Sequence, residues 1–191
     1  MSFSTTTYMT MQTPFHGPAA RTRRLTLLGT LGLGLALVFS SSADAQSASY
    51  TVTVTEQVQL GVAPARAWAA IEDFLTWPSW HPAFASTQLV KGDGHSAGTV
   101  RLIATRDGAQ FTEELISHDG ATRSLQYRIL TSPAPVVDYR STLSVKPARN
   151  GSTVVWSSEF KVKAGASEQE VKKMIAGIYR IGLDNLATAL E

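Results

Sequence analysis

The segment 110–117 alternates between two faces, and each face carries one carboxylate. Glu113 shares its face with Phe111 and Leu115, whereas Glu114 lies on the opposite face beside Ile116. Successive side chains of a strand point to opposite sides, so one of the two glutamates must point the same way as large apolar neighbours. A carboxylate in such surroundings can act as a general acid or base, anchor a polar group of a ligand, or form a buried ion pair.

Large aromatic residues occupy the apolar faces of two further predicted strands. Tyr127 shares its face with Leu125 and Ile129, and Trp156 shares its face with Phe160. Tyrosine and tryptophan combine a large apolar area with one polar group, so Tyr127 and Trp156 either pack in the core or contact a ligand. Three other tryptophans cluster around the first predicted helix, where core packing is the favoured interpretation: Trp68, Trp77 and Trp80.

The sequence lacks the usual motifs of several kinds of catalytic site. There is no cysteine, and no group of His, Asp and Glu has the spacing of a zinc site, so we expect no metal and no cofactor. Neither a Gly-x-Ser-x-Gly elbow nor a phosphate-binding glycine loop is present. His95 and His118 lie beside turn signals, where exposure is expected, and His16 lies near the N-terminus. His81 either has a structural role or lines a cavity mouth, and Glu56 is a further polar candidate on the first strand.

Charge is unevenly divided along the 191 residues. Residues 1–45 hold three arginines and one acidic residue, whereas residues 46–191 hold 14 basic and 14 acidic side chains. The second segment has a formal net charge of zero, so nothing in its charge favours nucleic acid or an anionic membrane as a partner. A hydrophobic content of 43% and the lack of cysteine exclude a disordered chain and a disulfide scaffold, and the length of this segment suits one domain.

Residues 1–45 contain the three parts of a secretory signal peptide. Arg21, Arg23 and Arg24 precede an apolar run at 25–39, and small residues at 40–45 end in an Ala-x-Ala pattern. A helix of that length spans about 22 Å, less than the roughly 30 Å of a bilayer core, so a cleaved leader is favoured over a membrane anchor. The paired arginines suit twin-arginine export as well as general secretion. We expect a mature protein from about position 46, exported, in the periplasm, and without a membrane span.

Residues 50–162 are predicted to form one strand, two short helices and six further strands. Tyr50–Leu60 alternates between apolar and polar residues, a helix begins at Pro64, and Pro78 and Pro82 interrupt the helical stretch after it. Three Asp-Gly or Asn-Gly pairs, at 107–108, 119–120 and 150–151, favour two-residue hairpin turns. The six later strands are predicted at Thr87–Val90, Thr99–Thr105, Gln110–Ser117, Thr122–Leu130, Val136–Val145 and Thr153–Val162.

The C-terminal segment has the pattern of a long helix. Ser167 and Glu170 form a capping box at its start. About 24 residues follow, which extend about 36 Å and are long enough to cross a whole sheet. Apolar residues recur at helical spacing and predict one buried stripe: Val171, Met174, Ile175, Ile178, Ile181, Leu183, Leu186 and Leu190.

The order of these elements resembles the helix-grip fold of the START-like SRPBCC superfamily, and in particular its bacterial polyketide cyclase/dehydrase-like branch. The resemblance covers most of residues 50–191. Ala67 departs from it, since such sequences usually carry valine before the tryptophan. The matching segments are Ala63-Pro64, Trp68, Asp73-Phe74, Trp80, Gly98-Thr99-Val100-Arg101, Glu113-Glu114-Leu115, Tyr127, Tyr139 and Trp156.

This resemblance implies an α+β domain over residues 46–191, with a bent seven-stranded antiparallel sheet wrapped around the C-terminal helix and a cavity between them. It favours Glu113 over Glu114 as the inward-facing carboxylate, with Arg101 as its basic partner. Strand parity and the resemblance together predict that the cavity is lined by Arg101, Phe111, Glu113, Leu115, Tyr127, Tyr139, Trp156 and Met174.

Two functions are compatible with such a cavity. The first is that of a non-catalytic exported protein that binds or carries a small apolar or aromatic molecule. The second is that of a cyclase, dehydratase or lyase that uses Glu113 or a tyrosine as general acid or base. Binding is favoured because no nucleophile, metal or cofactor motif is found. A strongly raised pKa of Glu113 in a cavity would favour the enzyme, and an ion-paired Glu113 would favour a ligand anchor or a structural pair.

Overall fold

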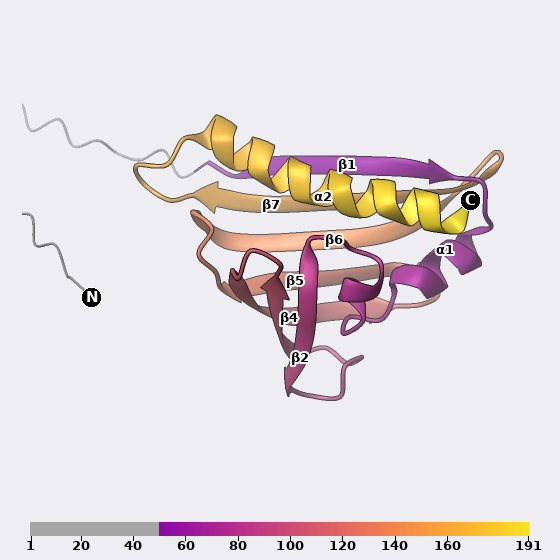
Figure 1. The fold of residues 1–191 in the computed structure, drawn as a ribbon, viewed down its shortest axis with the longest axis horizontal. Coiled ribbons are helices and arrows are strands. Elements are labelled where there is room, and N and C mark those ends of the chain that lie inside the picture. Colours follow the sequence, from indigo (N-terminus) through magenta and orange to yellow (C-terminus); the bar gives the residue numbers. More distant parts are fainter. Residues whose placement is uncertain (1–49) are drawn as a thin grey trace, which may run out of the picture. The chain divides into compact units, whose positions relative to one another are not determined.

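Seven antiparallel strands form one sheet in the computed structural model, which describes residues 50–191 (Figure 1). The strand order is β1-β7-β6-β5-β4-β3-β2, so the first strand pairs with the last. This confirms the predicted helix-grip arrangement, with strand ends displaced by up to three residues from the predicted bounds. The elements are β1 (Val52–Leu60), α1 (Pro64–Ile71), η1 (Trp77–Ser79), β2 (Phe84–Lys91), β3 (Val100–Thr105), β4 (Gln110–Asp119), β5 (Ser124–Thr131), β6 (Val136–Ala148), β7 (Gly151–Val162) and α2 (Glu168–Leu190).

The predicted signal peptide, residues 1–45, lies outside the described residues, and its cleavage and export route stay predictions. The described residues fall within one compact unit. Among residues 50–191, no helix is both long enough and apolar enough to cross a membrane.

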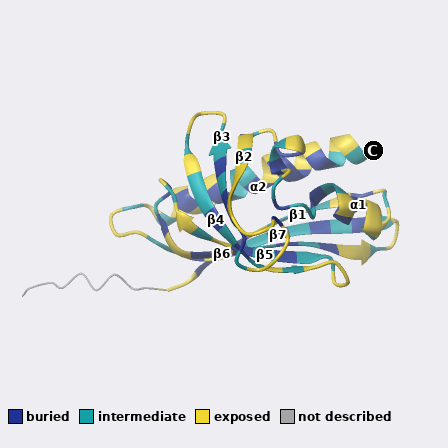
Figure 2. Ribbon diagram, turned by 90° about the horizontal axis from the view of Figure 1, so that it is seen from below, coloured by how far each residue is buried: buried dark blue, intermediate teal, exposed yellow. Residues whose placement is uncertain are grey.

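Helix α2 packs against β1 and β7 and is the longest helix among the described residues (Figure 1). It begins after Ser167, whose Oγ accepts a hydrogen bond from the Glu170 N–H at 3.4 Å, so the serine half of the predicted capping box is present. Buried side chains recur every three or four residues, so one stripe of the helix faces the sheet (Figure 2). The large residues of this stripe are Val171, Ile175, Tyr179, Leu183 and Leu186.

The observed stripe on α2 differs from the predicted one at five positions, of which Ile178 and Leu190 are partly buried against the core. Met174 and Ile181, which the spacing assigns to the stripe, are 41% and 48% exposed. Tyr179 is absent from the predicted stripe but is buried, because it stands four residues after Ile175 and four before Leu183. The buried face is therefore narrower than predicted and carries a phenol.

Two of the three predicted two-residue turns are longer than predicted. The 107–108 pair lies within a four-residue connection between Thr105 and Gln110. Asp119 is the last residue of β4, and Gly120 begins a four-residue connection that ends before Ser124. The Asp119 carboxylate accepts hydrogen bonds from the backbone N–H groups of Ala121 and Thr122, at 2.8 and 3.1 Å. Such a side chain satisfies the backbone of a wider turn, which a tight hairpin does not need.

The turn between β6 and β7 has two residues, but it lies one position earlier than predicted. Ala148 pairs with Gly151, so the turn residues are Arg149 and Asn150. Gly151 has a φ of 129°, and a Cβ at this position would collide with the carbonyl oxygen of Leu60. Glycine is required there because the end of β1 approaches the start of β7 closely.

Candidate ligand-binding site

A cavity of about 320 Å³ lies between α2 and the sheet. Its exposed rim includes Asp107 from the β3–β4 loop, Pro133 from the β5–β6 loop and Met174 from α2. The volume is at the small end of the range for ligand sites, roughly 300–1,000 Å³. The lining is mostly apolar and consists of Phe84, Ile103, Thr105, Asp107, Ala109, Phe111, Glu113, Tyr127, Ile129, Pro133, Ala134, Pro135, Tyr139, Trp156, Met174, Ile175, Ile178 and Tyr179.

Six of the eight predicted site residues border this cavity, namely Phe111, Glu113, Tyr127, Tyr139, Trp156 and Met174. Two do not, and this corrects the predicted lining. Leu115 is fully buried in the hydrophobic core, two positions beyond Glu113 on β4. Arg101 is also fully buried, because Phe74 and Trp77 cover it. Both residues support the wall of the cavity rather than forming its surface.

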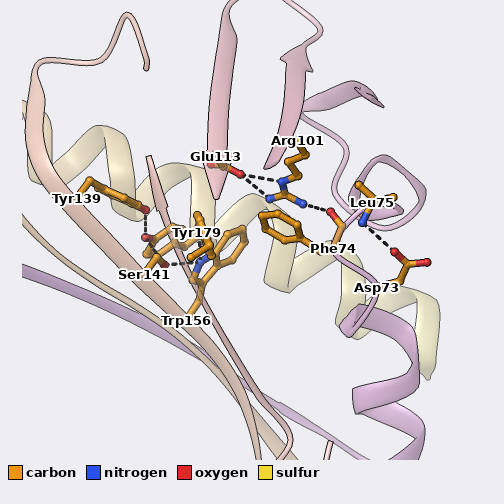
Figure 3. Close-up of polar contacts among 10 residues, drawn as sticks. Asp73, Phe74, Leu75, Arg101, Glu113, Tyr139, Ser141, Trp156 and Tyr179 are labelled. Carbon is orange, nitrogen blue, oxygen red and sulfur yellow. Dashed lines mark hydrogen bonds and ion pairs between the residues drawn. The ribbon is translucent and has the colours of Figure 1, made fainter. Parts of the chain in front are cut away.

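Arg101 and Glu113 face each other across β3 and β4 and form a buried ion pair (Figure 3). The Nε and Nη2 atoms of Arg101 donate to the Oε2 of Glu113 at 2.8 and 2.6 Å. Nη1 donates to the carbonyl oxygen of Phe74. The guanidinium lies 3.8 Å from the ring centroids of both Phe74 and Trp77, which adds cation–π attraction to each ring.

The loop after α1 is positioned to receive Arg101. The Asp73 Oδ1 accepts a hydrogen bond from the Leu75 N–H at 2.8 Å, which fixes the peptide on either side of Phe74 (Figure 3). The Phe74 carbonyl can then point at the guanidinium. Asp73 and Phe74 thus contribute to the site by holding one backbone carbonyl, that of Phe74, against Arg101.

The two oxygens of the Glu113 carboxylate have different environments. Oε2 accepts both hydrogen bonds from Arg101, whereas Oε1 has no hydrogen-bond partner within residues 50–191. The side chain is 8% exposed, and Glu113 lines the cavity. Glu114 lies on the outer face and pairs with Arg128 at 2.6 Å. The parity of β4 therefore turns Glu113, and not Glu114, toward the cavity.

Burial dominates the electrostatics of this pair. It raises the pKa of Glu113 above its ordinary value, and the attraction of Arg101 opposes that rise. Burial also lowers the pKa of Arg101, and Glu113 opposes that change. The ion pair is the feature that the sequence analysis associates with a ligand anchor or a structural pair, and the pKa of Glu113 is raised by burial beside it.

A second polar group in the cavity wall is a chain of hydroxyls (Figure 3). The Ser141 hydroxyl donates to the carbonyl oxygen of Ser157 at 2.8 Å, so its oxygen can only accept from its other neighbours. Tyr179 therefore donates to Ser141 at 3.1 Å, and Tyr139 donates to Tyr179. Trp156 Nε1 is shared between Ser141, at 3.0 Å, and the hydroxyl oxygen of Tyr127, at 3.2 Å.

The three tyrosines around the hydroxyl chain are neutral in the folded protein at ordinary pH. Burial raises the pKa of Tyr127, Tyr139 and Tyr179 well above the usual value for a phenol. They can donate hydrogen bonds to a ligand, but they cannot act as bases in this state. Of the two general bases considered in the sequence analysis, a tyrosine is therefore the weaker candidate.

The remaining polar candidates lie away from the cavity. Glu56 pairs with Arg180 on α2. His95 is exposed as predicted, whereas His118 is only partly exposed, because its ring lies 5.4 Å from that of Trp68. Among residues 50–191, no cluster of three His, Cys, Asp or Glu side chains could hold a metal ion.

His81 is fully buried and has a structural role. Its Nε2 donates to the carbonyl oxygen of Ile178 on α2 at 3.0 Å, and its Nδ1 accepts from the Ala83 N–H at 3.3 Å. This pattern fits the neutral ring. Burial, with a smaller contribution from Arg101, lowers the pKa of His81 to about 4.

We expect His81 to make the protein less stable in acid. The unfolded chain takes up a proton near the ordinary histidine pKa of about 6.5, whereas the folded protein takes it up at about 4. Stability is therefore full above pH 6.5 and falls by about 3 kcal/mol as the pH drops to 4. Urea unfolding of the wild type and His81→Gln should show this change in their stability difference. His95→Gln at the exposed site is the control, and a pH-independent difference for His81→Gln would contradict the prediction.

Several cavity residues are missing from the predicted site. Phe84 on β2, Ile103 on β3 and Tyr179 on α2 all line it, as does the proline-flanked loop at 133–135. Helical spacing from Ile175 was a usable signal for Tyr179. No local signal marks the loop, because its place over the cavity depends on the curvature of the whole sheet.

A bent antiparallel sheet that holds a long helix over an apolar cavity, with a few buried polar groups, defines the helix-grip class of fold. A family described as "Polyketide cyclase / dehydrase and lipid transport" matches residues 51–191, and the chain belongs to this family. The predicted SRPBCC relationship is thereby confirmed.

Individual relatives support the same assignment. MLP-like protein 423 of Arabidopsis thaliana is 26% identical over 118 residues, which are 56% of this chain and 75% of that protein. The structure of XoxI from Bacillus cereus is 31% identical, with a TM-score of 0.65, and covers 73% of this chain and 94% of its own. The structure of a Bacillus thuringiensis protein has the same identity and TM-score, and it covers 74% of this chain and 98% of its own. Ara h 8.0201, at 21% identity and a TM-score of 0.62 over 74% of this chain and 98% of its own, shares the fold. Membership of this family is consistent with binding of a hydrophobic small molecule.

Proposed function

We propose that this protein binds a small apolar or aromatic molecule that carries a hydrogen-bond donor, in the cavity between α2 and the sheet. One observation carries the proposal: Glu113 lines an apolar cavity of about 320 Å³, and its Oε1 has no hydrogen-bond partner among residues 50–191. The leader at 1–45 further supports a place of action outside the cytoplasm, in the periplasm.

The two parts of the site have different effects on binding. Apolar lining supplies affinity at about 25 cal/mol per Å² of buried surface, less the cost of ordering the ligand. The Glu113 oxygen supplies selectivity, because a ligand that leaves it unmatched forgoes about 1–3 kcal/mol. Hydroxyl or N–H groups suit this oxygen, whereas a ligand carbonyl or carboxylate would be repelled. The term "lipid transport" in the family description is compatible with a mostly apolar ligand.

A second candidate function is catalysis by a cyclase, dehydratase or lyase. The raised pKa of Glu113 favours it, because a carboxyl group whose pKa lies closer to neutrality exchanges protons more readily with a bound substrate. Arg101 would stabilise the carboxylate form after each proton transfer. The neutral tyrosines would orient the substrate through hydrogen bonds.

The binding proposal can be tested with 2-naphthol and naphthalene, which differ by one hydroxyl. We expect the wild type to bind 2-naphthol about tenfold more tightly, because the hydroxyl can donate to Glu113 Oε1. In Glu113→Gln the amide oxygen faces the donors of Arg101 and the NH₂ group faces the cavity. The preference for 2-naphthol should therefore fall, because its hydroxyl can then only accept from a neutral amide instead of donating to a carboxylate, while naphthalene binds as before. Fluorescence titration measures both affinities.

Glu114→Gln is the matched control, because it changes the neighbouring residue on the outer face of β4. It should leave both affinities unchanged. If neither probe binds, the cavity is not a ligand-binding site. If both probes bind equally well, the ligand does not need a hydrogen-bond donor. Native mass spectrometry of the protein from its own host then distinguishes the two functions. A co-purified molecule that loses water on incubation supports the enzyme, and an unchanged one supports the binder.

A further inference from the structure

The hydrogen-bonded ladder between β5 and β6 stops before either strand ends. Its last pair is Arg128 with Arg140, although β5 continues to Thr131 and β6 begins at Val136. The outer edges of both strands stay paired here, β5 with β4 and β6 with β7. A register shift in β6, with Asp138 at a φ of 54°, accompanies the separation. The two strands are therefore held apart by their neighbours, which distinguishes this opening from fraying at a sheet end.

A depression of about 570 Å³ fills the opening and adjoins the ligand cavity. Ile129 and Tyr139 line both spaces. Leu130 and Val137, which also line the depression, are apolar yet 44% and 41% exposed. The cavity and the depression therefore meet at Ile129 and Tyr139.

The walls of the depression are positively charged. Arg128, Arg140 and Lys163 line it, and the Lys163 N–H donates to the Pro135 carbonyl at 3.0 Å, which holds this residue beside the β5–β6 loop. Arg128 is paired with Glu114, and the lining carboxylate of Asp138 is paired with Lys161 at 2.7 Å. Within residues 50–191, neither Arg140 nor Lys163 forms an ion pair.

We propose that this depression is an anion-binding subsite and that the ligand is an amphiphile with a hydroxyl at its inner end and a carboxylate at its outer end. The inference rests on the proposed function, since the apolar body occupies the cavity. Glu113 excludes a second carboxylate from the inner end, because like charges repel strongly where water is scarce. Arg140 and Lys163 attract the carboxylate outside, and the ligand body passes Ile129 and Tyr139.

The test compares 12-hydroxydodecanoate with 1,12-dodecanediol, which differ in the outer group alone. We expect calorimetric titration of the full chain to show about five- to tenfold tighter binding of the acid, less so in high salt. Arg140→Met/Lys163→Met should remove this advantage and leave diol binding unchanged. The control Lys146→Met/Arg149→Met removes the same charge from exposed positions at the other end of β6 and should retain the advantage.

Four results would overturn the subsite. The first is equal binding of acid and diol, and the second is an acid preference that survives in Arg140→Met/Lys163→Met. The third is a preference lost in the control as well, since this indicates a general effect of net charge. If 2-naphthol binds and neither alkyl probe does, the subsite is wrong while the ligand-binding cavity stands. Circular dichroism of each variant confirms that these exposed substitutions leave the fold intact.

Discussion

Deletion of residues 167–191 is expected to abolish cooperative unfolding of this protein. The deleted segment contains the five large buried side chains of α2. At roughly 1.5–3 kcal/mol for each, their burial contributes about as much as the whole stability of a typical domain, about 5–15 kcal/mol. The deletion also removes Tyr179 from the hydroxyl chain and the Ile178 carbonyl from His81. Circular dichroism and tryptophan fluorescence during thermal unfolding will measure the loss.

A shorter deletion provides the matched control. Residues 188–191 follow Leu186, the last buried residue of α2. Without them, the protein should unfold cooperatively with a midpoint within about 5 °C of the full chain. If the protein without residues 167–191 melted in the same cooperative way, α2 would not be an integral part of the fold.

Local patterns were sufficient to predict most of the elements. The alternation of β4 depends on neighbouring residues, and so does the capping box at Ser167 and Glu170. The alternation is present, and so is the Ser167 half of the capping box. The separation of β5 from β6 was not predicted, because both strands have ordinary β patterns. It depends on the partners that hold their outer edges, and these are chosen by the whole sheet.

The candidate site was predictable to the extent that strand parity governs it. Parity and the family resemblance together placed Glu113 inward with Arg101 as its partner. They did not predict that Arg101 is fully buried. Phe74 and Trp77, from the helical segment about 25 residues earlier, cover it. Which side chains cover a polar residue depends on long-range packing, so burial of this cation required the structure.

Removal of Arg101 is expected to be among the most destabilising single changes in the protein. Arg101→Met leaves the Glu113 carboxylate buried without its counter-ion and the Phe74 carbonyl without its donor. An uncompensated buried charge costs about 3–5 kcal/mol. Urea unfolding should show a loss of this size. Arg128→Met is the control, because the Arg128–Glu114 pair joins adjacent strands on the outer face and is partly exposed, and such a pair contributes at most about 1 kcal/mol.

Replacing both partners separates the structural role of the pair from its role toward a ligand. Arg101→Met/Glu113→Leu removes both charges and fills their volume with apolar atoms, so we expect stability within about 2 kcal/mol of the wild type, most of the difference arising at the Phe74 carbonyl. The same variant should bind 2-naphthol and naphthalene equally, since no carboxylate oxygen faces the cavity. A double variant as unstable as Arg101→Met would show that the cost is lost packing rather than the unpaired charge. If the stability recovers while the preference for 2-naphthol is retained, another group, such as Tyr127, binds the ligand hydroxyl. The prediction therefore assigns the stability to the pair as a unit and the selectivity to Glu113 Oε1.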